Sequence, residues 1–283
     1  MRLVKSLVGR CLYLISLLSE QTGTLPLGEI STRLDMPKSA AHRLLATFCD
    51  LGWAEQDPQT GFYRLTLRLA IAGQRLLAGT RIPDICQPVL DELATATESL
   101  GRLAIVGVDG LTWIAQSQGA RAGLVYQPEL VARVPLHITA NGKAWLATLP
   151  HQEALRLAVE SGLGRPGIGG PRAIRTRETF SAALDETRER GWSMAFEEAE
   201  AGVGAIAAPI IQNGGTVGTV SIAGPIHRFS DASLDALVAG LCSAAHTLSE
   251  LWPYRMPHAA DGVATSGGRQ SPPAARSELT LPA

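Results

Sequence analysis

Apolar residues recur at helical spacing through the first part of the chain. Residues 3–20 carry them on one face, and residues 27–45 (LGEISTRLDMPKSAAHRLL) have the pattern of two short helices joined by a tight turn. Pro37 can open the second helix, because the first helical position has no use for the missing N–H. The inward positions are apolar, and those where two helices must touch are small: Ile30, Leu34, Met36 and Leu44, with Ser31 and Ala41. This segment therefore predicts a helix-turn-helix.

Short strand-like runs follow the second helix. Residues 57–61 (DPQTG) have the composition of a turn, with Trp53 before them and Phe62 and Tyr63 after them. A β-hairpin in this place predicts the wing of a winged helix-turn-helix. Residues 66–79 then return to helical spacing, which predicts a linker helix over 68–80.

The outward face of the second helix is polar. Lys38, Ser39, His42 and Arg43 would all lie on it. Two cations and two hydrogen-bonding groups on a short helix suit insertion into the DNA major groove, where such groups meet base edges or phosphates. We predict that these residues contact DNA, with Arg33 from the first helix and Arg64 from the wing. The alternative is a polar face that only meets water.

The rest of the chain mixes helical and strand patterns without strict alternation. Helices are expected over 84–98, 141–149, 151–161, 176–190 and 230–252, with Thr176 and Ser230 as N-caps. Strands are expected near 103–108, 111–117, 192–196, 203–211 and 216–223, with turns at Asp109-Gly110 and at residues 213–215. This predicts an α+β domain with an antiparallel sheet over 81–252. Residues 253–283 are rich in Pro, Gly, Ser and Ala, which predicts a disordered tail.

Charge supports the same division of the chain. The net charge is −1, but residues 1–80 hold nine basic and six acidic residues, so that this part is +3 and the remainder is −4. A basic N-terminal part fits contact with a polyanion at one end only. A difference this small can also arise by chance.

Cysteine use and hydropathy exclude several classes of protein. Cys11, Cys49, Cys86 and Cys242 are too far apart to form a metal-ligand pair or a disulfide framework, and their apolar neighbours predict buried free thiols. There is no signal-peptide pattern and no apolar run of the roughly 18 residues that span a bilayer. We therefore expect a cytoplasmic protein with no membrane partner.

The motifs that could indicate catalysis or a cofactor are weak. Residues 162–170 are rich in glycine but lack the spacing of a phosphate-binding loop, and no GxSxG nucleophile motif occurs. The acidic residues Glu197, Glu198 and Glu200 have no nearby histidine, which favours a structural loop over a metal site. We predict no catalytic residue, no metal and no cofactor.

An anion site is predicted at TANGK (139–143). A helix that begins near Ala140 would present the backbone N–H groups of Ala140, Asn141 and Gly142, and this positive end favours a carboxylate. Gly142 would let a ligand approach the backbone. Lys143 would either add charge to the site or point to solvent.

Five segments together resemble the IclR family of bacterial transcriptional regulators. They are SLVGRCLYLISLLSE, LGEISTRLDMPKSAAHRLLATFCDLGWAEQD, VPLHITANGKAWLATL, ETRERGWSMAFEEAEAGVGAIAAPI and GTVSIAGP. The resemblance covers about residues 3–252. It implies a winged helix-turn-helix domain over 1–67, the linker helix, and a GAF-like effector-binding domain over 81–252. It also implies dimers, or dimers of dimers, on palindromic operator DNA, and a small metabolite, often a carboxylic acid, as effector.

The resemblance implies effector-binding positions, and the chain departs from the family at several of them. In the family, ligands lie on the start of the helix at Ala140–Gly142 and on the strands that contain Ala205, Ser221 and Ala223. Some members carry polar residues where this chain has Ala195, Ala205 and Ala223. We expect a larger and more apolar pocket that favours a bulkier or aromatic acid over a small keto acid. The alternative is that these alanines only pack the sheet.

The sequence therefore predicts a ligand-responsive transcriptional regulator. Two other hypotheses stay open. One is a regulator that has lost its ligand and binds DNA constitutively, and the other is an enzyme whose helix-turn-helix is only a protein-contact module.

Overall fold

The computed structural model describes residues 6–19, 24–108, 110–120, 125–126 and 134–252. The expected tail over 253–283, Asp109 of one expected turn, and both ends of the expected first helix lie outside these ranges. Within them, no helix is long and apolar enough to cross a membrane.

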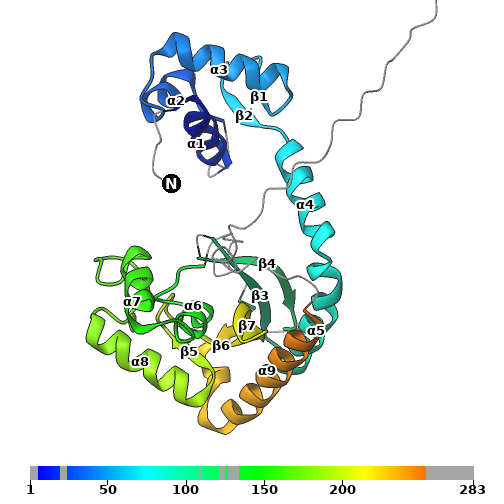
Figure 1. The fold of residues 1–283 in the computed structure, drawn as a ribbon, viewed down its shortest axis with the longest axis vertical. Coiled ribbons are helices and arrows are strands. Elements are labelled where there is room, and N and C mark those ends of the chain that lie inside the picture. The colour runs from blue at the N-terminus through cyan, green and yellow to red at the C-terminus, as the bar shows by residue number, and fades with distance from the viewer. Residues whose placement is uncertain (1–5, 20–23, 109, 121–124, 127–133, 253–283) are drawn as a thin grey trace, which may run out of the picture. The chain divides into compact units, whose positions relative to one another are not determined.

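The N-terminal part is a winged helix-turn-helix. It consists of α1 (Leu7–Ser19), α2 (Leu27–Arg33), α3 (Lys38–Asp50), β1 (Ala54–Gln56) and β2 (Tyr63–Leu65) (Figure 1). The two strands pair in antiparallel orientation, as expected for the β-hairpin predicted to form the wing. The apolar residues expected to face inward form its core: Ile30, Leu34 and Leu44 are buried with Leu14 and Leu45, and Met36 packs against them.

Local hydrogen bonds explain the turns of this part. The carboxylate of Asp57 accepts from the backbone N–H groups of Gln59 and Thr60, at 2.9 Å each, and so fixes the hairpin turn. Pro37 lies one residue earlier than predicted. Its ψ of 145° is extended rather than helical, so Pro37 stands at the N-cap of α3 and the helix begins at Lys38.

The next segment is helical, as predicted. Helix α4 (Arg68–Thr80) has no buried residue, and its Leu76 is 74% exposed. Helix α5 (Ile82–Thr97) follows after Arg81, whose φ of 59° separates the two helices. Helix α5 begins two residues before the expected start at Asp84, because Ile82 is already buried in the core of the next domain.

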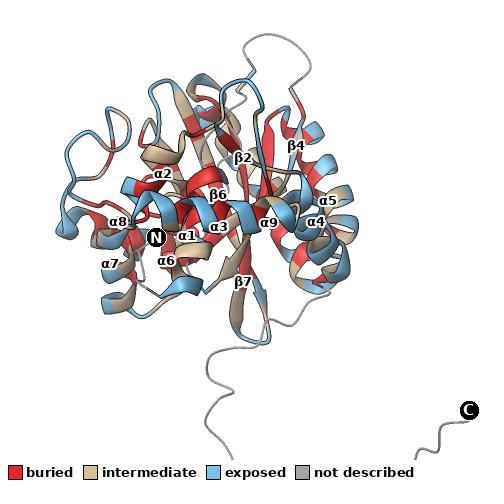
Figure 2. Cartoon of the chain, turned by 90° about the horizontal axis from the view of Figure 1, so that it is seen from above, coloured by how far each residue is buried: buried red, intermediate tan, exposed pale blue. Residues whose placement is uncertain are grey.

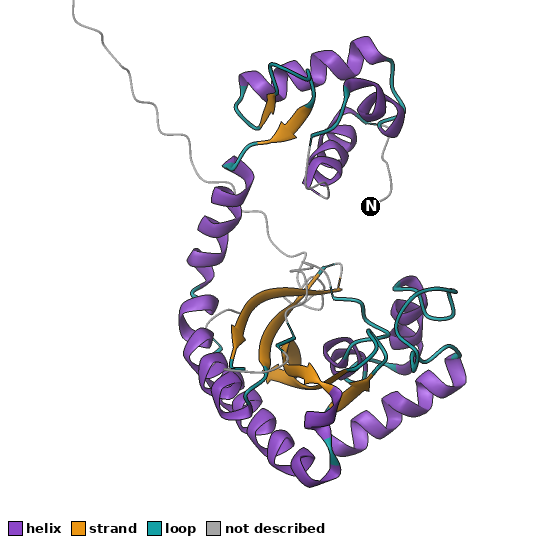
Figure 3. Ribbon diagram, turned by 180° about the vertical axis from the view of Figure 1, so that it is seen from behind, coloured by secondary structure: helices purple, strands orange, loops and turns teal. Residues whose placement is uncertain are grey.

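The C-terminal part is built on one antiparallel sheet, which confirms the α+β prediction. Its strands, drawn in orange in Figure 3, are β3 (Leu100–Gly107), β4 (Gly110–Gln118), β5 (Ser193–Phe196), β6 (Val203–Gln212) and β7 (Gly215–Pro225). They pair in the order β4-β3-β7-β6-β5. Helices α5 and α9 (Asp231–Leu251) cover one face. Alternate residues of β6 and β7, such as Ile206 and Ile222, point into that core.

The opposite face of the sheet carries the other helices. These are α6 (Ala140–Leu146), α7 (His151–Glu160) and α8 (Arg177–Arg190), and a short 3-10 helix, η1 (Ile226–Phe229), leads into α9. The strands and the inward sides of the helices are buried, whereas the outer sides of the helices are exposed (Figure 2). This face holds the second core, which includes Trp145, Leu146 and Phe180.

The two predicted N-caps have different outcomes. The Thr176 hydroxyl accepts from the Thr179 N–H at 3.2 Å, which confirms the cap of α8. Ser230 stands at the N-cap of α9 but makes no cap hydrogen bond. Its hydroxyl instead lies 3.1 Å from that of Ser233.

The prediction of four buried thiols was wrong in part. Cys86 is buried and Cys11 and Cys49 are partly buried, but Cys242 is exposed on α9. Apolar neighbours in the sequence did not show that Cys242 faces away from the sheet that α9 covers. Burial raises the pKa of the Cys86 thiol to about 11.

Candidate functional site

The polar face of α3 is exposed along the helix. Lys38, Ser39, His42 and Arg43 all face solvent, whereas Ala41 and Leu45 are fully buried. Arg43 has no ion-pair partner in the described ranges. This exposed face is the one for which DNA contact was predicted.

The other two arginines predicted to contact DNA each form an ion pair with a nearby glutamate. Arg33 pairs with Glu29 at 2.7 Å on α2, and Arg64 pairs with Glu55 at 2.5 Å across the wing. All four side chains are largely exposed, and exposed pairs of this kind contribute about 0–1 kcal/mol. A phosphate could therefore replace either carboxylate at little cost.

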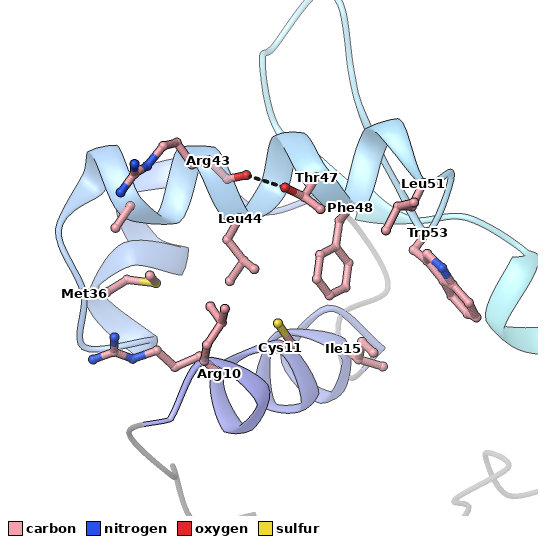
Figure 4. A pocket seen from close by; sticks show the side chains of 12 residues that line it. Arg10, Cys11, Ile15, Met36, Arg43, Leu44, Thr47, Phe48, Leu51 and Trp53 are labelled. Carbon is pink, nitrogen blue, oxygen red and sulfur yellow. Dashed lines mark hydrogen bonds between the residues drawn. The ribbon is translucent and has the colours of Figure 1, made fainter.

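A groove of about 720 Å³ lies beside α3 in the N-terminal part. Leu44 and Phe48 of α3 point toward Cys11 and Ile15 of α1, and Arg43 lies along α3 at its edge (Figure 4). The groove is mainly apolar, so it does not extend the polar face of α3.

We expect Arg43→Ala to weaken operator binding by about 1–3 kcal/mol, or roughly 5- to 150-fold, because the helix loses an exposed cation. An electrophoretic mobility shift with the operator would measure it. Arg177→Ala is the matched control, since Arg177 is an exposed arginine at the start of α8. Equal operator affinities of the two variants would show that Arg43 does not contact the DNA.

A second cavity, of about 230 Å³, lies between α6 and the sheet. Six of the seven residues predicted to bind the effector line it. They come from four elements: Ala140 and Asn141 from α6, Ala195 from β5, Ala205 from β6, and Ser221 and Ala223 from β7. Strand register explains why they meet, because Ala205 is paired with both Ala195 and Ala223 across neighbouring strands.

Gly142 does not line this cavity, and its N–H group is not free as predicted. It donates to the Thr139 hydroxyl at 3.1 Å, which caps α6. A Cβ on Gly142 would overlap the backbone of Leu136, well inside the 3.0 Å that real Cβ atoms keep. Packing against the preceding loop, rather than the approach of a ligand, therefore requires glycine at this position.

Lys143 takes neither of the two positions predicted for it. It is 3% exposed, and its Nζ lies 2.5 Å from Oε1 of Glu198, which is itself 8% exposed. Burial lowers the pKa of Lys143 and raises the pKa of Glu198, although each group also attracts the other. The pair holds α6 against the loop that follows β5.

Glu197 and Glu198 of that loop make further structural contacts. The Glu197 carboxylate accepts from the Gly202 N–H at 3.0 Å and lies 3.3 Å from Nε of Arg172. The Glu198 carbonyl accepts from the Gly170 N–H at 2.7 Å. Among the residues with described positions, no group of three His, Cys, Asp or Glu side chains could hold a metal.

Sequence reasoning missed Arg102, Trp113 and Tyr126, which also line the cavity. Arg102 lies on β3 and is 6% exposed, and its guanidinium stacks 4.5 Å from the centre of the Trp113 ring. A single arginine within the apolar strand LGRLAIVG was a signal that could have identified it, because charged residues are rarely buried in a sheet without a partner.

Comparison with known proteins agrees with this architecture. The model of the IclR helix-turn-helix domain matches residues 7–58, and that of the bacterial transcriptional regulator IclR C-terminal domain matches residues 74–250. The chain is 31% identical to the HTH-type transcriptional regulator XynR of Escherichia coli, over 80% of this chain and 89% of XynR. It is 30% identical to KdgR of the same species, over 80% of this chain and 85% of KdgR.

Solved structures have the same fold. A putative transcriptional regulator of Rhodococcus sp. RHA1 superposes with a TM-score of 0.71 and 25% identity, over 87% of this chain and 97% of that one. An IclR homolog from Microbacterium hydrocarbonoxydans, in complex with 4-hydroxybenzoate, gives a TM-score of 0.70 at 21% identity, over 87% and 98% of the two chains. From its winged helix-turn-helix, its sheet domain and these matches, the chain belongs to the IclR family of DNA-binding transcriptional regulators.

Proposed function

We propose that this regulator binds a small carboxylic acid in the cavity between α6 and the sheet, and that the acid changes its affinity for operator DNA. The observation that carries the proposal is the cavity itself, which combines an alanine wall with buried polar groups. Pockets for small molecules commonly have this composition of mainly apolar lining and a few polar groups.

The size of the cavity favours an aromatic acid. An engineered apolar cavity of about 150 Å³ holds benzene, and this one has about 230 Å³. The small side chains of Ala195, Ala205 and Ala223 leave space for a ring and a carboxylate. The solved homolog in complex with 4-hydroxybenzoate supports the same class of ligand.

We further propose that the chain acts in the cytoplasm as a dimer, or a dimer of dimers, on palindromic DNA. A dimer places two copies of α3 on successive major grooves, and the two-fold axis is matched by the palindrome. An effector acts by favouring one spacing of these helices over another, so it must bind the two arrangements with different affinities. The domain limits proposed for this switch are 1–67, 68–80 and 81–252.

A binding experiment with the purified full-length chain tests this function. We expect it to protect a palindromic site in the DNA beside its own gene in a footprint. We also expect an aromatic acid to raise its melting temperature and change the operator affinity at least about fivefold, a typical coupling. DNA binding that no acid changes would support the constitutive regulator, and turnover of an acid would support the enzyme.

A further inference from the structure

We propose that Arg102 is the residue that recognises the anionic group of the effector, so that the carboxylate is bound on β3 rather than at the start of α6. This inference rests on the proposed function and specifies how the ligand lies in the cavity. Three features of Arg102 support it: the burial of the side chain, the guanidinium N–H groups that have no acceptor, and the position of the residue in the sheet.

The first observation is a buried cation with unused donors. Nε and Nη2 of Arg102 are both buried, and neither has a hydrogen-bond partner in the described part of the chain. An arginine side chain stays protonated in proteins, and buried charged donors without a hydrogen-bond acceptor are strongly unfavourable. An anionic ligand would supply the missing acceptors.

The second observation is which donors are unused. The N–H groups of Nε and Nη2 lie side by side along one edge of the guanidinium. This edge matches the two oxygens of a carboxylate and can donate two parallel hydrogen bonds. The ring of Trp113 lies against the guanidinium, at 4.5 Å, and keeps it in one plane. The stacking therefore fixes the orientation of the edge that would bind a carboxylate.

The third observation is the position of other donors. Arg102 is paired directly with Ser221 in the register of β3 and β7, so both side chains lie on the same face of the sheet, and both line the cavity. The indole Nε1 of Trp113 is also buried without a partner within the described ranges. The donors thus gather at the β3 side of the cavity, opposite the alanine wall of β5 and β6.

The start of α6 offers a carboxylate fewer donors than predicted, because only the uncharged N–H groups of Ala140 and Asn141 remain of the three expected there, whereas Arg102 offers a full positive charge. The N–H group of Gly142 is already donated to Thr139, and that of Lys143 to the Thr139 carbonyl. The nearby ammonium of Lys143 is paired with Glu198. We therefore infer an aromatic monocarboxylate whose carboxylate meets Arg102 and whose ring lies against Ala195, Ala205 and Ala223.

Calorimetry on the full-length chain tests this role with three acids and their neutral amides: benzoate, 4-hydroxybenzoate and phenylacetate, each against its amide. We expect the wild-type protein to bind at least one acid ten times more tightly than its amide. Arg102→Gln should lower the affinity for that acid 10- to 100-fold and change the affinity for its amide less than threefold, so that the preference for the anion disappears.

Arg190→Gln is the matched control. Arg190 also stacks on a tryptophan, Trp192 at 4.6 Å, but its Nε already donates to the Trp192 carbonyl, and the residue does not line the cavity.

Without ligand, Arg102→Met should not lower the melting temperature, whereas replacing an arginine with a purely structural role would lower it. Acid binding that Arg102→Gln retains would overturn the role of Arg102 and leave the proposed function intact. If the wild-type protein binds none of the three acids, both the aromatic-acid response and this role are overturned.

Discussion

Lys143→Met is expected to destabilise the folded chain by about 3–5 kcal/mol, the usual effect of removing one partner of a buried ion pair. Lys143 and Glu198 are both almost fully buried, and the second carboxylate oxygen of Glu198 already lacks a partner within the described ranges. Without the lysine, the whole Glu198 charge would be left uncompensated. The thermal midpoint should fall by about 6–20 °C, at roughly 2–4 °C for each kcal/mol.

The double variant Lys143→Met/Glu198→Leu separates the charge from the packing. Burial shifts the pKa of each group against its charged form, which means that desolvation outweighs the attraction. An apolar pair of similar volume should therefore recover most of the lost stability. Lys38→Met on the exposed face of α3 is the control and should change stability by less than about 0.5 kcal/mol.

The pH dependence of Lys143→Met gives an independent measurement. Lys143 lowers the pKa of Glu198 against the rise that burial causes, so removing the lysine raises the folded-state pKa of Glu198 further, and the folded variant binds a proton that its unfolded state releases at the same pH. The deficit of the variant should shrink as the pH falls toward that pKa and grow at higher pH. Urea titrations at several pH values would measure this. A deficit that does not change with pH would mean that the lysine acts by packing and not by charge.

Local sequence signals predicted much of the fold. The spacing of Ile30, Leu34 and Leu44 was sufficient for the helix-turn-helix, and Thr176 for the start of α8, because the interactions that decide these elements lie within a few residues. The order of the strands in the sheet depends on pairings between distant segments. The absence of strict alternation predicted an antiparallel α+β domain, but no signal in the sequence predicted the order β4-β3-β7-β6-β5.

The candidate cavity was predicted less completely, for the same physical reason. Ala140 and Asn141, named from the helix start at TANGK, and Ser221, named from the family pattern, line the cavity, and their contact with an effector stays a prediction. Arg102 was missed because its burial depends on β4 and β7, which pair with it from residues 116 and 221. The partner of Lys143 was missed because Glu198 lies 55 residues away. A single sequence gives no pairing between residues so distant.

Gly142→Ala should destabilise the C-terminal domain by about 3 kcal/mol or more, at the upper end of the range for overpacking a closed site. A methyl group there would overlap the carbonyl oxygen, Cα and carbonyl carbon of Leu136. These are backbone atoms, which cannot rotate away as a side chain does. The Leu136 N–H also donates to the Ser161 hydroxyl at 2.8 Å, so the loop is held from its other side.

Gly73→Ala on α4 is the matched control for this substitution. It lies within a helix like Gly142, but a Cβ there meets no atom within 4 Å, so the greater helix propensity of alanine should leave stability equal or higher by about 1 kcal/mol. Chemical denaturation of both variants makes the comparison. A Gly142→Ala protein as stable as Gly73→Ala would mean that the loop before α6 can move away, and the glycine of TANGK would then be available to a ligand after all.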